Sequence, residues 1–297
     1  MELRHLQTLL AIRDRKSFTA AAKSLGITQA AVSQHVAGME ESLGVRLFDR
    51  QGRRVQLTSA GSKLCQHADR ILDLVAAATA DVQGHPLSVQ GPLHIASSTV
   101  PAATILPRVL SEFRRQFPSV QPKLDVSDSE RAVAAVSRRD ADVGFAGFLP
   151  KVKGLLPHCV AEDELVLIPA PDHPLASRKS ISVKQLSETP LIVREPNSGS
   201  FRCLEEALEK QGLPLSEMQV AMQANSNDAI VAAVRSGTGV SFISSTLVSE
   251  EVEAGELAVI KVRSLRPKRK LYMVSPAESD GREPLRTFLD FVRTSMP

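Results

Sequence analysis

The stretch that decides the fold of the first part of the chain is SFTAAAKSLGITQAAVSQHVAGMEESLGVRLFDRQGRRVQLTSAG, residues 17–61. Ser17 and Thr28 each stand just before a helical run, where their side-chain oxygens can cap the helix. Gly26 and Gly44 follow those runs, and glycine readily adopts the positive φ that ends a helix. Two short helices joined by a tight glycine turn form the outline of a helix-turn-helix. The two predicted helices cover residues 18–25 and 29–43.

The second of these helices is the predicted DNA-reading element. In a helix-turn-helix it lies in the major groove, and its first residues face the base edges. Gln can pair with adenine, whereas Ala and the Thr methyl group can touch thymine. The segments VRLFDR and RRVQLT around Gly52 predict a two-stranded basic hairpin, either a solvated turn or a wing on phosphates or a narrow minor groove. The predicted DNA-binding residues are Thr28, Gln29, Ala30, Ser33, Gln34, Arg50, Arg53 and Arg54.

Positive charge is concentrated at this end of the chain. Residues 1–60 contain nine Lys or Arg and five Asp or Glu, whereas the formal net charge of all 297 residues is only +3. The basic surplus therefore coincides with the predicted helix-turn-helix. Aromatic residues make up 4% and Trp is absent, which argues against a protein that stacks single-stranded bases on exposed rings. The expected nucleic-acid partner is double-stranded DNA.

A long helical run follows within residues 58–88, TSAGSKLCQHADRILDLVAAATADVQG, with Thr58 as its predicted cap. Apolar residues recur at helical spacing and form one face, which a small domain would leave in water. We therefore predict that this helix pairs with a second copy of itself, giving a dimer that binds pseudo-palindromic sites. The predicted face consists of Leu64, His67, Ala68, Ile71, Leu74, Val75 and Ala78.

Residues 92–297 alternate short apolar strands with helices, which predicts parallel sheets covered on both faces. The segment VAEDELVLIP at 160–169 and a return near 266–272 predict two lobes joined by two crossings. The first lobe would hold about 92–162 and 268–297, and the second about 163–267. The predicted strands are 93–97, 123–127, 141–146, 165–169, 191–194, 219–224, 240–243, 257–261 and 270–274. The predicted helices lie near 101–116, 129–139, 200–211, 226–236, 245–253 and 283–295.

Residues 17–61 strongly resemble the N-terminal domain of LysR-type transcriptional regulators. The Ala-rich helix, the GITQ turn, the recognition helix, LFDR and LTSAG occur together and in register. The one departure is His35-Val36, where a basic or polar residue followed by Ile or Leu is commoner. The resemblance implies a multi-domain protein: an all-α winged helix-turn-helix, a long linker helix and a two-lobed α/β domain similar to periplasmic binding proteins. It further implies a homotetramer built as a dimer of dimers, with RNA polymerase as a further partner.

Two clusters in the α/β part predict an effector site. The strand LHIAS ends in hydroxyl residues before a helix, and REPNSGSFR at 194–202 places hydroxyls and two arginines before another. Hydroxyls and free N–H groups at helix starts suit an anion, which two lobes could enclose. Plain helix caps and surface ion pairs with Glu195 or Glu205 are the alternative. The REPNSGSFR segment looks most like the sulfur-assimilation, CysL-like branch of the family. The predicted effector-binding residues are Ser98, Thr99, Arg194, Ser198, Ser200, Arg202 and Asn227.

Other classes of protein are disfavoured. The N-terminus lacks the pattern of a signal peptide, and no run of about 18 apolar residues could span a bilayer. Three cysteines without a CxxC pair indicate a reducing compartment, and we predict a cytoplasmic protein with no cofactor and no metal site. Cys203 is either a redox sensor or, as its lack of a nearby partner favours, a small buried hydrophobe. A transport-type binding protein and an α/β enzyme remain as alternative functions, and neither an export signal nor an acid/base pair supports them.

Overall fold

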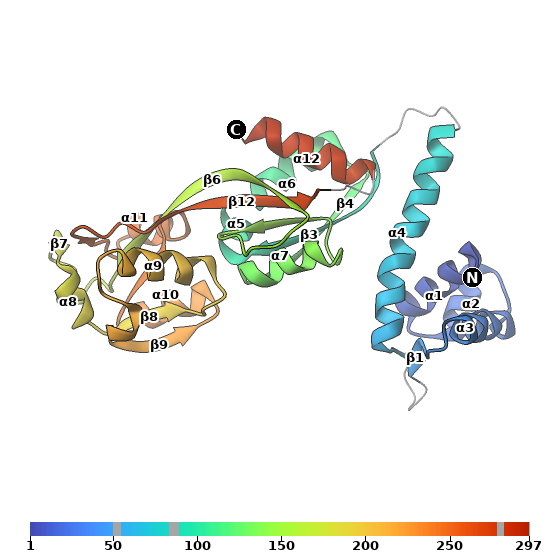
Figure 1. The fold of residues 1–297 in the computed structure, drawn as a ribbon, viewed down its shortest axis with the longest axis horizontal. Coiled ribbons are helices and arrows are strands. Elements are labelled where there is room, and N and C mark those ends of the chain that lie inside the picture. The colour runs from blue at the N-terminus through green and yellow to red at the C-terminus, as the bar shows by residue number, and fades with distance from the viewer. Residues whose placement is uncertain (50–54, 83–88, 278–281, 297) are drawn as a thin grey trace. The chain divides into compact units, whose positions relative to one another are not determined.

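The computed structural model describes residues 1–49, 55–82, 89–277 and 282–296 (Figure 1). Contacts divide the chain into two compact units, Met1–Leu87 and Ser88–Pro297. Among the described residues no helix is long and apolar enough to cross a membrane.

The first unit begins with three helices and a small antiparallel sheet. Ser17 Oγ accepts a hydrogen bond from Ala20 N at 3.2 Å, and Thr28 Oγ1 accepts one from Ala31 N at 3.1 Å. Gly26 and Gly44 have φ of 67° and 68° and end the two helices, which have the predicted bounds. The elements are α1 (Leu3–Arg15), α2 (Phe18–Leu25), α3 (Gln29–Leu43), β1 (Phe48–Asp49) and β2 (Gln56–Leu57).

The hairpin strands are anchored to the helices by backbone contacts. Glu40 Oε1 accepts hydrogen bonds from the backbone N–H groups of Leu47 at 2.7 Å and Phe48 at 3.4 Å. Gly61 lies so close that an added Cβ would stand 2.0 Å from the carbonyl oxygen of Leu47. Glu40, which the sequence did not single out, and Gly61, the glycine of LTSAG, therefore hold the base of the wing in place. The predicted wing contacts Arg50, Arg53 and Arg54 lie outside the described residues.

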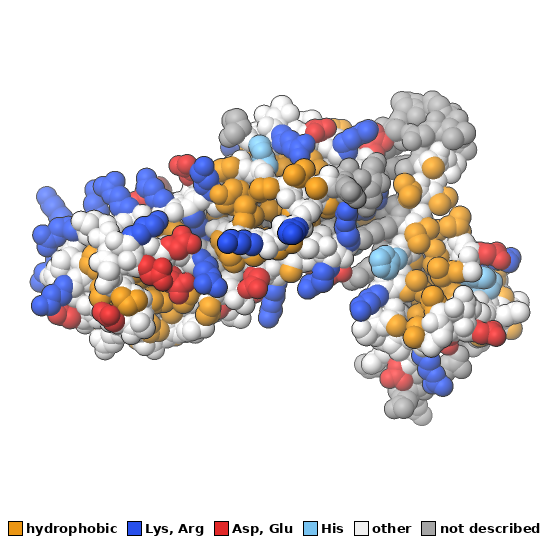
Figure 2. Space-filling model, in the orientation of Figure 1, with side chains coloured by type: hydrophobic (Ala, Val, Ile, Leu, Met, Phe, Trp, Pro, Cys, Tyr) orange, Lys and Arg blue, Asp and Glu red, His pale blue; other side chains and the backbone are white. Residues whose placement is uncertain are grey.

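Helix α4 (Ser59–Val82) packs against α1 at its start and presents an exposed apolar face further on. Ala68 is buried and Leu64 half-buried in the core of the first unit, beside Cys65 and Leu72. The predicted single face is therefore wrong for these two residues, because positions 64, 68 and 72 form a separate stripe that docks on α1. The remaining members of the predicted face are exposed: His67, Ile71, Leu74, Val75 and Ala78. Figure 2 shows hydrophobic side chains gathered over α4.

The second unit contains an eight-stranded sheet in the order β4-β3-β5-β12-β6-β10-β8-β9. Its strands are β3 (Gly91–Ser98), β4 (Val120–Ser127), β5 (Val143–Ala146), β6 (Leu155–Ile168), β8 (Leu191–Arg194), β9 (Val220–Ala224), β10 (Val240–Ser244) and β12 (Lys268–Pro276). A separate parallel pair is formed by β7 (Ser180–Ile181) and β11 (Lys261–Val262). The helices are α5 (Thr99–Thr104), α6 (Leu106–Gln116), α7 (Ser129–Ser137), α8 (Val183–Ser187), α9 (Gly199–Glu209), α10 (Asn227–Arg235), α11 (Ser249–Glu253) and α12 (Glu283–Ser295).

Strands β6 and β12 are the two crossings between the lobes. Residues 155–164 of β6 pair with β12, and residues 165–168 pair with β10, in both cases antiparallel. The prediction of parallel sheets is therefore wrong for these strands, although β3, β4 and β5 and then β8, β9 and β10 run parallel as expected. The physical reason is that β6 carries the chain from lobe I to lobe II and β12 carries it back. The two strands therefore run in opposite directions, and neighbours that do so pair antiparallel.

Lobe I contains strands β3, β4 and β5, and lobe II contains β8, β9 and β10. Each lobe has helices on both faces of its part of the sheet (Figure 1). In lobe I, α6 and α12 pack around Phe113 and Phe288 on one face, and α7 packs on the other through Val133. In lobe II, α9 and α10 cover opposite faces. The predicted strand at 257–261 is wrong, because the strand found there, β11, contains only Lys261 and Val262. The sequence also did not predict β7 or α8.

Candidate DNA-reading helix and effector cleft

Helix α3 is held by one face and leaves the other exposed. Val32, Val36 and Met39 are buried against α1 and α2. The five predicted reading residues all lie on the exposed side of the helix or at its cap: Thr28, Gln29, Ala30, Ser33 and Gln34. Ala37 and Gly38 are also exposed and extend the same face, which the helical spacing would have revealed.

The departure at His35 is a packing feature. The Nδ1 atom of His35 lies 2.8 Å from Oγ1 of Thr8, whose hydroxyl donates to the carbonyl of Arg4. The ring of His5 lies 4.7 Å from that of His35, and burial together with the His35 ring lowers the pKa of His5 below its usual value. His35 therefore joins α3 to α1, which fixes the angle at which the reading face is presented.

Helix starts from both lobes converge at the carboxyl ends of the parallel strands. Asp128 accepts a hydrogen bond from Arg131 N at 2.8 Å and caps α7, whereas Ser198 accepts one from Phe201 N at 3.1 Å and caps α9. Ser226 caps α10 in the same way, through Ala229 N at 3.3 Å. The helix-cap alternative for Ser98, Thr99 and Ser200 is wrong in detail. Ser98 stands at the N-cap of α5 but its side chain makes no cap hydrogen bond, and the cap of α9 is Ser198 rather than Ser200. Because helix N-termini carry partial positive charge, their convergence favours an anionic ligand.

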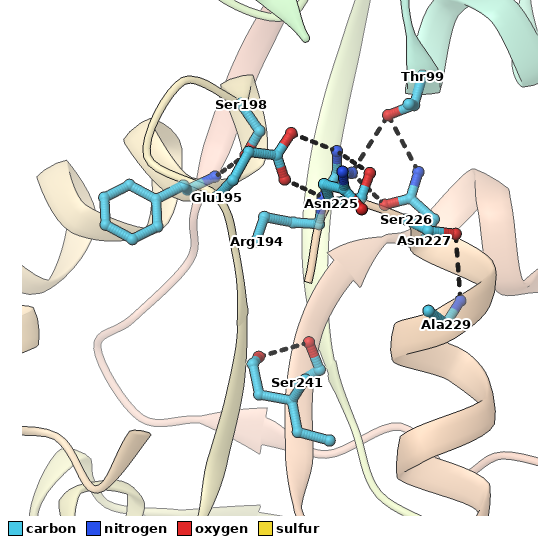
Figure 3. Close-up of polar contacts among 11 residues, drawn as sticks. Thr99, Arg194, Glu195, Ser198, Asn225, Ser226, Asn227, Ala229 and Ser241 are labelled. Carbon is cyan, nitrogen blue, oxygen red and sulfur yellow. Dashed lines mark hydrogen bonds and ion pairs between the residues drawn. The ribbon is translucent and has the colours of Figure 1, made fainter. Parts of the chain in front are cut away.

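Arg194 joins the two lobes. Its side chain is only 3% exposed, and its Nε and Nη2 donate to the carboxylate of Glu195 at 2.8 and 2.9 Å. Nη1 donates to Thr99 Oγ1 of lobe I at 3.2 Å and, in a short hydrogen bond, to Oδ1 of Asn227. Asn227 Nδ2 also donates to Thr99 Oγ1 at 3.2 Å (Figure 3). Every nitrogen of the Arg194 guanidinium therefore has an acceptor within the protein.

A small cavity lies where the lobes meet. Its volume is about 10 Å³, which is room for about one water molecule. An added Cβ at Gly199 of lobe II would stand 2.7 Å from the carbonyl carbon of Gly147 in lobe I, so the lobes touch through glycine. The cavity is lined by Ser98, Thr99, Val100, Asp128, Ser129, Arg194, Ser198, Gly199, Ser200 and Arg269.

Five of the seven predicted effector residues line this cavity, and two do not. Asn227 reaches it only through its hydrogen bond to Thr99. Arg202 is 43% exposed and its Nη1 donates to Glu205 at 3.2 Å, so the structure does not bring Arg202 to the cavity. The surface ion pair considered for Arg202 is what the structure contains.

Five lining residues were not among the predicted effector-binding residues: Val100, Asp128, Ser129, Gly199 and Arg269. Arg269 of β12 donates through Nε to Asp163 of β6 at 2.8 Å, and Asp163 also accepts from Ser244 Oγ at 2.7 Å. A signal for this pair exists in the sequence, because strand alternation places Asp163 on the buried face of Leu165 and places Arg269 on that of Leu271. Charged residues on the buried faces of two strands indicate an ion pair between them.

Two of the three cysteines, Cys65 and Cys203, are poorly suited to redox chemistry. Burial raises the pKa of Cys203 to about 11, and it does the same for Cys65. Both thiols therefore stay protonated near neutral pH, where the thiolate is the reactive form. Among the described residues no three His, Cys, Asp or Glu side chains gather as a metal ion would require.

Comparison with protein families agrees with both halves of this arrangement. Residues 3–62 match the bacterial regulatory helix-turn-helix proteins of the lysR family, and residues 88–297 match the LysR substrate binding domain. The chain belongs to the LysR family. This confirms a DNA-binding transcriptional regulator with an effector-binding domain, and it disfavours the transport-protein and enzyme alternatives.

Relatives of this LysR-family chain are named as regulators. The transcriptional activator CmpR of a Synechocystis species is 31% identical over 98% of this chain and 94% of its own length. The regulatory domain of Synechocystis CcmR, solved with 2-PG, is 26% identical with a TM-score of 0.63 and covers 70% of this chain and 98% of its own. Full-length CbnR, solved with its target DNA, shares the fold with a TM-score of 0.68 at 22% identity, over 99% of this chain and 100% of its own.

Proposed function

We propose that this LysR-family regulator binds its operator as a dimer, with α3 reading the base edges. We further propose that a small anionic effector binds between lobes I and II and changes how the protein binds DNA. The observation that carries the effector part is the convergence of capped helix starts from both lobes on one cavity. A ligand there would touch both lobes, so it can favour one arrangement of them over another.

For DNA reading, the exposed face of α3 is the proposed surface for base edges, with Gln29, Ser33 and Gln34 as the polar readers. We assign phosphate or minor-groove contacts to the wing arginines Arg50, Arg53 and Arg54. Few phosphate contacts are available to one subunit, so useful affinity requires two half-sites. We therefore propose residues 1–60 as the DNA-binding domain.

For assembly, the exposed residues of α4 are the proposed dimer surface. Ile71, Leu74 and Val75 are 37%, 53% and 39% exposed, and Ala78 continues the stripe by one turn. A second copy of the same helix would cover this stripe. We therefore assign 58–88 to a dimerisation helix and 92–297 to the effector-binding domain. The dimer of dimers and a contact with RNA polymerase follow from the family resemblance, and a cytoplasmic location follows from the three cysteines without a CxxC pair. All three stay predictions.

For the effector, the proposed chemistry is a compact oxoanion. The 2-PG named for CcmR and the sulfur oxyanions expected of the CysL-like branch both fit that class. The similarity to CmpR and CcmR favours a phosphate compound such as 2-PG over a sulfur oxyanion.

The test is operator binding by the full chain with and without effector. DNA from beside its own gene is titrated with protein in a fluorescence anisotropy assay, against random duplex of equal length, at two salt concentrations. We expect preference for the gene-adjacent DNA and a change in apparent Kd or footprint with 2-PG or thiosulfate. Equal binding to both duplexes, with no response to either anion, would contradict the proposed function.

A further inference from the structure

Arg269 lines the cavity between the lobes, and one nitrogen of its guanidinium donates no hydrogen bond. The Arg269 side chain is 7% exposed, and its Nη2 is buried without a hydrogen-bond partner. Nη2 lies 2.7 Å from Asp163 Oδ2, but it is so oriented that the hydrogen bond to this oxygen comes from Nε instead. The charge of the guanidinium is thus paired with Asp163, but this buried N–H donor lacks a well-oriented acceptor, and a buried donor without one is costly. A ligand oxygen that accepted from the guanidinium would remove that cost.

The guanidinium lies at the seam between the lobes. Its Nη1 would stand 2.9 Å from an added Cβ at Gly147 of lobe I and equally 2.9 Å from one at Gly199 of lobe II. Neither glycine has positive φ, so backbone conformation does not demand glycine here. The lack of space requires glycine at both positions, because any side chain there would displace Arg269 from the seam.

The two buried arginines of the cavity differ in what they can still bind. All three nitrogens of Arg194 already have acceptors on Glu195, Asn227 and Thr99. Arg269 has one carboxylate partner and a spare buried nitrogen. Arg194 therefore serves to hold the lobes together, and Arg269 is the guanidinium with donors to offer.

We propose that Arg269 is the anion receptor of the effector cleft and binds one oxoanion group, a phosphate, sulfate or carboxylate, at the seam between Gly147 and Gly199. This rests on the proposed function, which places an anionic effector in the cleft. The N-termini of α7 and α9 face the same cavity and complement the charge. The hydroxyls of Ser98 and Ser200, which also line it, can donate to the same group.

The position of Arg269 links the proposed anion to β6 and β12, the two strands that cross between the lobes. Arg269 lies on one crossing strand, Asp163 on the other, and Ser244 at the end of β10 bonds Asp163. An oxoanion on the guanidinium competes with Asp163 for its N–H donors, so binding acts on both crossing strands at once. The cavity of about 10 Å³ is too small for an oxoanion group, so the contact between Gly147 and Gly199 must open for the ligand to enter.

The test is calorimetric titration of the full chain with four probes: 2-PG, inorganic phosphate, sulfate and glycolate. Comparing inorganic phosphate with sulfate shows whether the site prefers a phosphate group or a sulfur oxyanion. Glycolate shows whether a carboxylate alone is enough for binding. We expect at least one probe to bind wild type and its affinity to fall at least tenfold in Arg269→Gln. Lys270→Gln, an exposed change next to Arg269 in the same strand, is the matched control and should bind as wild type does.

Two further variants keep the test decisive. Arg269→Gln leaves Asp163 without its partner, so the double change Arg269→Gln with Asp163→Asn removes both charges, and its cooperative thermal unfolding is checked without anion. Gly199→Ala keeps Arg269 but fills the seam, and it should also lose binding. The receptor role is overturned if a folded Arg269 variant binds a probe as tightly as wild type, or if wild type binds none of the four. The preference of the wild type for gene-adjacent over random DNA is measured separately. If that preference is present, either result overturns the receptor role of Arg269 without overturning the proposed DNA-binding function.

Discussion

Nη1 of Arg194 in lobe II donates a hydrogen bond of 3.2 Å to Oγ1 of Thr99 in lobe I. The same oxygen accepts from Nδ2 of Asn227, also at 3.2 Å. A single threonine hydroxyl thus joins two side chains of the opposite lobe. Both cross-lobe hydrogen bonds of the Arg194 cluster therefore end on this hydroxyl (Figure 3).

Thr99→Val should loosen the closed cleft. It keeps the shape of the side chain but removes the acceptor of both cross-lobe hydrogen bonds, and each is worth about 0.5–1.5 kcal/mol. We expect amide hydrogen exchange around residues 194–202 to rise by roughly tenfold or more, since local opening becomes easier. Thr104→Val on the same helix is the control, because its hydroxyl bonds only the backbone of Val100. Unchanged protection in Thr99→Val would contradict the assignment.

Gly61→Ala should destabilise the first unit. The added Cβ would stand 2.0 Å from the backbone oxygen of Leu47, so α4 or the wing strand must move, at a cost of roughly 1–3 kcal/mol or more. Gly38→Ala is the matched control, since nothing lies within 4 Å of its added Cβ and Ala favours a helix by up to about 1 kcal/mol. Urea denaturation followed by circular dichroism measures both. The close approach is refuted if the two variants are equally stable.

Leu74→Glu should weaken self-association. Leu74 is 53% exposed on α4, and a charge on a face covered by a second copy would be buried without a partner. Light scattering with size-exclusion chromatography should detect a shift to smaller species. Lys63→Gln, exposed on the same helix, should keep the wild-type mass. An assembly unaffected by Leu74→Glu would place the dimer surface elsewhere.

The pH dependence of stability should carry a contribution from His5. Its pKa is lowered by burial and by His35, so below the usual value of about 6.5 the unfolded chain binds a proton that the folded chain does not. Stability is therefore lost as the pH falls below that value. His5→Gln should show a smaller drop in Tm than wild type between pH 7 and 5.5. Equal drops in the two proteins would show that another group is responsible.

Local signals predicted the helix-turn-helix well, and non-local pairing accounts for most errors. Ser17, Thr28 and the two glycines that follow their helices act within a few residues, so the bounds of α2 and α3 came out as expected. The strand predicted at 257–261 failed, because β11 depends on pairing with β7, which lies about 80 residues earlier in the chain.

The candidate site divides in the same way. Ser98, Thr99, Ser198 and Ser200 stand at helix starts, which local sequence predicts, and all four line the cavity. Arg269 comes from a strand 106 residues away from its partner Asp163, and only the sheet brings the two together. Arg202 belonged to the predicted cluster, but the turn of α9 carries it to the surface.

The most direct test of the account is the preference for operator over random DNA when the reading face of α3 is removed. Gln29→Ala, Ser33→Ala and Gln34→Ala are combined in the full chain, with Thr79→Ala on α4 as the control. Because good base contacts are worth about 1–3 kcal/mol each, the operator-to-random affinity ratio should fall at least tenfold, while binding to random duplex keeps its salt dependence. An unchanged ratio in the triple variant would contradict the claim that α3 reads the operator.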